Sequence, residues 1–103
     1  MGYNIYAAWY FEGEGRMKIV YSKSSLKFLK GLDKKSAEKI RQAIEGLTHI
    51  PPKGDIKPMQ GYENGTKRLR IGSWRVIYKI DSDDNIKILY IISIGNRGDI
   101  YKK

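Results

Sequence analysis

The 103-residue sequence contains no cysteine, a single histidine and only three prolines. Without cysteine the chain can form neither disulfides nor a thiolate site, which fits a reducing compartment such as the cytoplasm. No apolar run approaches the roughly 18 residues that a membrane-spanning helix needs. A chain of this length predicts one domain with a modest hydrophobic core.

Acidic residues are scarce compared with basic ones. Eleven Asp and Glu stand against twenty Lys and Arg, which gives a net charge of +9 and a pI of about 9.8. A basic domain of this size is typical of proteins that meet a polyanion: nucleic acid, an anionic membrane or an acidic partner protein. A soluble, lysine-rich surface would give the same composition. The positions of the charges are therefore needed to distinguish these two interpretations.

The first sixteen residues, MGYNIYAAWYFEGEGR, differ in composition from the rest of the chain. They hold five aromatic side chains and one basic residue, with Glu-Gly-Glu-Gly near their end. We interpret residues 1–16 as an N-terminal extension or leader that precedes a domain at 17–103. The alternative is an added edge strand, or a segment that docks in an apolar groove.

The first half of the domain predicts a strand and two helices. MKIVY, residues 17–21, alternates and is β-branched, which is typical of a strand. Ser22 is a good N-cap for a short helix that stops near Gly31, and Asp33 can cap a second helix that must end before Pro51. One apolar stripe recurs along the second helix at Ala37, Ile40, Ile44 and Leu47.

The second half predicts a loop followed by three strands. Residues 51–66 are rich in Pro, Gly and Asn, whereas 67–71, 74–81 and 86–94 have strand patterns separated by polar turns. The last of these is almost wholly apolar, so we expect it at the sheet centre. The predicted class is α+β: a small antiparallel sheet with an N-terminal strand, an α-helical hairpin on one face, and the opposite face free.

The stretch KRLRIGSWRVIYKI brings several cations onto one strand pair. Because strand side chains alternate between faces, Arg68 and Arg70 point away from the helices, and the simplest register puts Arg75 beside them. Guanidinium groups are planar, always charged and able to donate two hydrogen bonds to a phosphate. A solvated strand face with salt-bridged arginines is the alternative, although few acids are expected to be available nearby to pair with them.

An ordered set of motifs resembles the RelE/ParE superfamily of small toxins from type II toxin–antitoxin modules. The set comprises the strand-helix-helix opening, the KPMQG turn, the RLRIGSWRVIY hairpin and the IGNRGDIY close, and it runs from Met17 to the C-terminus. RelE-like members are ribosome-dependent endoribonucleases that cut mRNA in the decoding site. ParE-like relatives share the fold and instead poison DNA gyrase.

The resemblance implies a metal-independent and cofactor-free RNA-cleaving site. Its catalytic positions fall on Arg75, Arg97 and Tyr101, and its RNA-binding positions on Arg68 and Arg70, flanked by Lys67 and Lys79. Because side chains alternate along a strand, Lys67 lies on the face opposite to that of Arg68 and Arg70. The resemblance implies that Arg75 and Arg97 stabilise charge, and that Tyr101 transfers a proton or stacks on a base. We expect both arginine side chains to face solvent.

This chain departs from the family pattern in two ways. Family archetypes have lysines where Arg68 and Arg70 stand, and many relatives have histidine where this chain has Asn96. Arginine is a poor general base because its pKa exceeds roughly 12, so that role has no assigned residue. Lys67 or Lys79 could serve, but Lys67 lies on the wrong face. His49 is interpreted as a helix-end residue.

We therefore expect a toxin that cleaves mRNA on the ribosome. The expected partners are mRNA, ribosomal RNA and an acidic, partly disordered antitoxin that forms a hetero-oligomer with the toxin. No membrane is expected as a partner. A gyrase inhibitor and a non-catalytic RNA-binding module are the alternatives.

Overall fold

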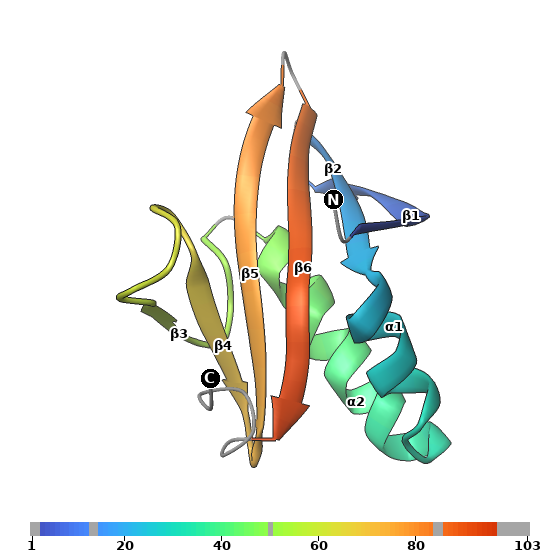
Figure 1. Cartoon of the computed structure of the whole chain (residues 1–103). Helices are drawn as coiled ribbons and strands as arrows, with labels where there is room; N and C mark the ends of the chain where they lie inside the picture. The colour runs from blue at the N-terminus through green and yellow to red at the C-terminus, as the bar shows by residue number, and fades with distance from the viewer. Residues whose placement is uncertain (1–2, 13–14, 50, 84–85, 97–103) are drawn as a thin grey trace.

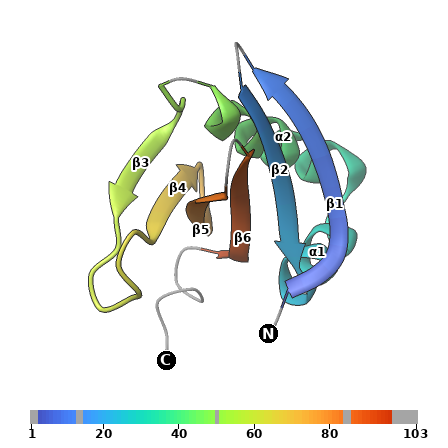
Figure 2. The same cartoon turned by 90° about the horizontal axis from the view of Figure 1, so that it is seen from above.

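The computed structural model describes residues 3–12, 15–49, 51–83 and 86–96, which form a six-stranded sheet and a helical hairpin. Both helices lie on one face of the curved sheet (Figures 1 and 2). The elements in chain order are β1 (Tyr3–Glu12), β2 (Gly15–Ser22), α1 (Lys23–Lys30), α2 (Lys34–Glu45), the 3₁₀ turn η1 (Gly46–Thr48), β3 (Asp55–Pro58), β4 (Lys67–Ile71), β5 (Trp74–Asp83) and β6 (Ile86–Asn96). Neither helix is long and apolar enough to cross a membrane.

The strand order across the sheet is β1-β2-β6-β5-β4-β3. The α+β class with a helical hairpin on one face is confirmed. Four neighbouring pairs are antiparallel, but β2 runs parallel to β6, so the sheet is mixed rather than wholly antiparallel. Parallel neighbours need a long connection, and here the helices and the three intervening strands supply it.

Both helix starts and the end of the first helix are confirmed. The Ser22 hydroxyl accepts a hydrogen bond from the Ser25 amide at 3.1 Å, and the Asp33 carboxylate accepts one from the Ser36 amide at 3.0 Å. Gly31 is the C-cap of α1. These side chains satisfy amides that have no partner inside the helix, and this is why they fix where each helix begins.

The hydrophobic core lies between the helices and the sheet. The α2–η1 stripe buries Ile40, Ile44 and Leu47, as the spacing predicted, against β2, β4, β5 and β6. The apolar strand β6 is central, as expected. A register shift opposite Ile77 and Tyr78 turns β6, so that Leu89, Ile91 and Ile94 all reach the core.

The structure adds a strand within the predicted loop 51–66. Residues Asp55–Pro58 form β3, which pairs antiparallel with β4 at the edge of the sheet. A strand of four residues that ends in proline is too short to show a recognisable alternation of apolar and polar residues. Proline fits this position because β3 is an edge strand.

Residues 3–12 form β1, which pairs with β2 at the opposite edge. This is the arrangement that the alternative interpretation of the N-terminus described. The domain boundary at Met17, and the dispensability of residues 1–16 for folding, stay predictions that the melting temperature of a shortened chain would test.

Candidate functional site

The β4–β5 register brings three arginines onto the sheet face that the helices leave uncovered. Arg70 lies directly opposite Arg75, and Arg68 lies opposite Ile77, two residues further along β5. The intervening residues Leu69 and Val76 belong to the core on the other face. Strand alternation therefore predicted this cluster correctly. We call Arg68, Arg70 and Arg75 the sheet arginines.

Two of the sheet arginines are buried, which corrects the expectation that this face is free and that Arg75 faces solvent. Arg68 is 7% exposed and Arg75 3% exposed, and Ile77 between them is fully buried. Only Arg70 is well exposed. Alternation predicts the face of a side chain but not its depth, which depends on the neighbours that gather on a curved sheet.

Asp55 of β3 joins two of these arginines. Its Oδ1 accepts a hydrogen bond from Nη2 of Arg68 at 3.2 Å, and its Oδ2 lies 3.7 Å from Nε of Arg70. The expectation that few acids are available nearby is therefore wrong. Asp55 was missed because it lies 13 residues before Arg68, in the segment that was predicted to be a loop. Its place opposite Arg70 follows only from the β3–β4 register.

Lys79 shares the arginine face and also has acidic neighbours. Its Nζ lies 3.1 Å from Oε2 of Glu63 and 3.9 Å from Oδ2 of Asp81, and its side chain is 20% exposed. Lys67 lies opposite Tyr78 and is exposed on the helix side, as parity predicted. Arg97 and Tyr101 lie outside the described residues.

Part of the guanidinium surface has no partner among the described residues. The Nε atoms of Arg68 and Arg75 are buried and make no hydrogen bond. Nη1 of Arg75 donates to the Trp74 carbonyl at 3.2 Å, and Arg75 forms no ion pair within the described ranges. Buried polar groups are normally satisfied, because leaving one unpaired costs about 1–3 kcal/mol. An orphaned donor on two of the three sheet arginines favours an anion-binding role.

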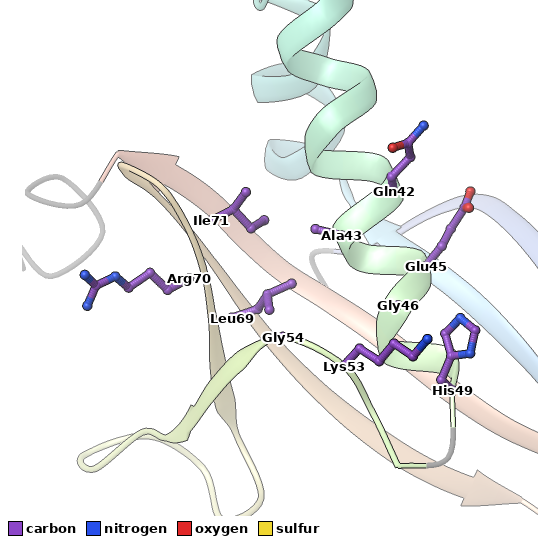
Figure 3. Close-up of a pocket in the computed structure, with 10 residues that line it drawn as sticks. All are labelled: Gln42, Ala43, Glu45, Gly46, His49, Lys53, Gly54, Leu69, Arg70 and Ile71. Atoms are coloured by element: carbon purple, nitrogen blue, oxygen red, sulfur yellow. The ribbon is translucent and has the colours of Figure 1, made fainter.

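Neither His49 nor Tyr78, two side chains that could accept a proton, faces this cluster. His49 follows η1 at the end of the second helix, as expected, and lines a hollow of about 440 Å³ between α2 and β4. In Figure 3 Leu69 and Ile71 point into this hollow while the Arg70 side chain points away from it. Burial raises the pKa of Tyr78 to about 12, and its side chain belongs to the core.

Within the described ranges no three His, Cys, Asp or Glu side chains lie close enough together to hold a metal ion. The sheet arginines offer the chemistry of fixed cations: binding a phosphate and stabilising negative charge that develops on it.

Comparison with known proteins defines the class. Residues 19–101 match the family model of the ParE toxin of type II toxin–antitoxin systems, parDE. The chain belongs to this family, within the RelE/ParE superfamily, and is a toxin of a type II toxin–antitoxin system.

The relatives lie on the RelE side of the superfamily. RelE1 of Methanocaldococcus jannaschii, whose name marks it as a candidate toxin, is 34% identical over 90 residues, covering 84% of this chain and 97% of that protein. The RelB–RelE antitoxin–toxin complex of Methanococcus jannaschii superposes with a TM-score of 0.57 at 25% identity, covering 79% of this chain and 93% of that one.

A second solved complex, RelBE2 of Mycobacterium tuberculosis, has a TM-score of 0.61 at 20% identity over 77% of this chain and 95% of that chain. At this identity the likeness supports the fold alone. The fold that the sequence motifs implied is thus found in known toxins.

Proposed function

We propose that this toxin is a RelE-like endoribonuclease that cleaves mRNA on the ribosome. The observation that carries the proposal is the cluster of sheet arginines, two of them buried with an unsatisfied Nε. A buried guanidinium holds a fixed orientation in a medium of low dielectric constant, where its attraction for a phosphate is stronger than in water.

The reaction needs four contributions from the site and its surroundings. The 2′-oxygen of a nucleotide attacks the adjacent phosphorus, a base accepts its proton, cations stabilise the phosphorane charge, and an acid protonates the leaving 5′-oxygen. Arg75 is the group we assign to the phosphorane, because it has no carboxylate partner among the described residues. Arg68 and Arg70 hold the neighbouring phosphate. Arg97 and Tyr101 are assigned by resemblance, Arg97 to charge and Tyr101 to proton transfer or stacking.

The general base stays unassigned among the described residues. His49 lies on the far side of β4, and Tyr78 faces the core. The nearest carboxylate to the sheet arginines is Asp55, which two guanidinium groups already engage. An enzyme without its own base would depend on the ribosome for the geometry of attack and would cut slowly without it.

Inhibition of DNA gyrase is the second candidate function. The observation that favours it is the family model itself, which is that of the ParE toxin. A non-catalytic RNA-binding module would use the same arginines without cleavage. The 34% identity with RelE1 over nearly the whole of that protein favours the RelE-like alternative.

The proposed partner is an acidic antitoxin that is partly disordered when alone. Two structures that share this fold are antitoxin–toxin complexes, and a net charge of +9 leaves a large field for an acidic partner to neutralise. The cytoplasm, where ribosomes and mRNA meet, is the proposed location.

Induced expression in cells tests this proposal against its alternatives. We expect arrested translation and transcript ends at codon-spaced positions, with plasmid supercoiling unchanged. Double-strand breaks with an SOS response would overturn the proposal in favour of gyrase inhibition. Growth arrest with intact transcripts and intact supercoiling would favour the non-catalytic module.

A further inference from the structure

The helical hairpin carries a second cationic surface, on the other layer of the molecule from the sheet arginines. Residues 23–45 hold seven cations against three carboxylates, a net charge of +4. All six lysines are exposed and form no ion pair among the described residues, whereas Arg41 pairs with Glu38 at 3.3 Å. We call them the hairpin lysines: Lys23, Lys27, Lys30, Lys34, Lys35 and Lys39.

The hairpin lysines are divided between the two helices. Lys23, Lys27 and Lys30 are spaced by four and three residues, which puts them in one stripe along α1. Lys34, Lys35 and Lys39 lie on α2, around a shallow hollow that Glu38 and Gln42 complete. The turn between the helices, at the lower end of the molecule in Figure 1, joins the two groups.

Two of these lysines stand where a helix disfavours them. Lys34 and Lys35 open α2, and its first turn contains no acidic residue. The start of a helix carries the positive end of the macrodipole, so carboxylates stabilise it and lysines destabilise it. The dipole of α2 therefore disfavours these two charges, and helix stability does not explain them.

We propose that the hairpin lysines bind the phosphate backbone of structured RNA. Lysine is a hydrated point charge that suits phosphates arranged along a backbone, and it is depleted in the cores of protein–protein interfaces. The identity of this RNA rests on the proposed function: the hairpin lysines dock the toxin on ribosomal RNA while the sheet arginines face the mRNA. Contacts of this kind read shape and charge, not sequence.

The test is binding of a 20-base-pair RNA duplex made uncleavable by 2′-O-methyl groups, followed by fluorescence anisotropy in about 50–300 mM KCl. The full-length chain is compared with a Lys34→Gln/Lys35→Gln variant. Each lost phosphate contact lowers the slope of log K against log salt by about 0.9, so we expect the slope to fall by roughly one to two. We also expect the melting temperature to stay the same or rise, which a structural role for these lysines would not produce.

A Lys53→Gln/Lys87→Gln variant is the matched control. It removes the same charge from two other exposed positions, and it should keep the slope within about half a unit of the unsubstituted chain. Equal losses in the two variants would overturn the proposal, because binding would then follow net charge alone. No duplex binding at 50 mM KCl would also overturn it.

An acidic peptide tests whether the hairpin lysines bind a protein instead of RNA. If a poly-glutamate peptide binds more tightly than the duplex and depends on Lys34 and Lys35, the hairpin is a protein-docking surface and the proposal is wrong. Because the duplex cannot be cleaved and no ribosome is present, these results do not depend on whether the toxin cuts mRNA. A failure of the cleavage assay would leave the duplex result standing.

Discussion

The two cationic regions of this toxin use different residues in different surroundings. The sheet arginines lie on rigid neighbouring strands, two of them are buried, and Asp55 holds two of them at 3.2 and 3.7 Å. The hairpin lysines are exposed on helices and have no acidic partner among the described residues. One region fixes a few charges in place, and the other spreads many mobile charges over a surface.

This difference matches two separate requirements of a catalytic RNA-binding protein. Stabilising a phosphorane demands donors held in position before the reaction, and burial supplies both position and a low dielectric constant. Docking on a large polyanion demands only a field and many weak contacts, which screening by salt reduces. We therefore expect substitutions in the first region to change the rate and those in the second to change affinity.

The largest effect is expected from Arg75→Met. Cleavage should fall by about 10²–10³, the usual loss when a charge-stabilising donor is removed. The melting temperature should stay constant or rise, because methionine fills similar space and because the substitution removes a buried charge that has no carboxylate partner among the described residues. Paired measurements of cleavage and melting check both. Full activity together with a large loss of stability would instead identify Arg75 as a structural residue.

Gly54→Ala should be the most destabilising substitution near the sheet arginines. Gly54 has φ of +128°, and an added Cβ would lie 2.5 Å from Cδ1 of Leu69. We expect a loss of about 2 kcal/mol or more and displacement of β3, which carries Asp55. Gly61→Ala is the control, because φ there is +80° but nothing lies within 4 Å of the added atom. Thermal melting compares them, and equal losses would show that only backbone strain matters.

Asp55→Asn should separate binding from chemistry. Freeing Arg68 and Arg70 from a carboxylate strengthens the cationic field, so uncleavable RNA should bind about two to five times more tightly, the size expected for partly exposed ion pairs. The cleavage rate on bound RNA should fall because the guanidinium groups lose their orientation. Asp81→Asn, on the same face but paired only with Lys79 at 3.9 Å, is the control. Weaker RNA binding by Asp55→Asn would contradict this role.

The smallest effect concerns the cap of α2. Hydrogen bonds from Ser36, first its side chain and then its backbone, lower the pKa of Asp33 below 3.8. The stabilisation that the Asp33 carboxylate gives to the folded state is therefore present above pH 3.8, and it is lost as the pH falls through the lower pKa of the folded state. Asparagine caps helices about equally well without titrating. Melting from pH 7 to 2.5 should show that wild type loses stability relative to Asp33→Asn only below about pH 4; parallel curves would exclude the effect.

The sequence was sufficient for the features that depend on local chemistry. Ser22 and Asp33 marked the helix starts, the Ile40–Ile44–Leu47 spacing identified the buried stripe, and alternation put the sheet arginines on one face. Each of these follows from the repeat of a single element.

The features that the sequence did not reveal depend on contacts between distant segments. The parallel β2–β6 pair, the β3 strand and the Asp55 contacts join residues whose proximity no local pattern encodes. No local pattern encodes the burial of Arg68 and Arg75 either. Hence the cluster was predicted while its burial and its carboxylate partner were not.

Single-turnover mRNA cleavage on programmed ribosomes, over a range of toxin concentrations, tests the central claim most directly. The account predicts that Arg75→Met lowers the maximal rate by about 10²–10³ while the half-saturating concentration changes little. It predicts the reverse for Lys34→Gln/Lys35→Gln: an unchanged maximal rate and a raised half-saturating concentration. If Arg75→Met cuts at the wild-type maximal rate, or if both variants change the same parameter, the division between sheet arginines and hairpin lysines is wrong.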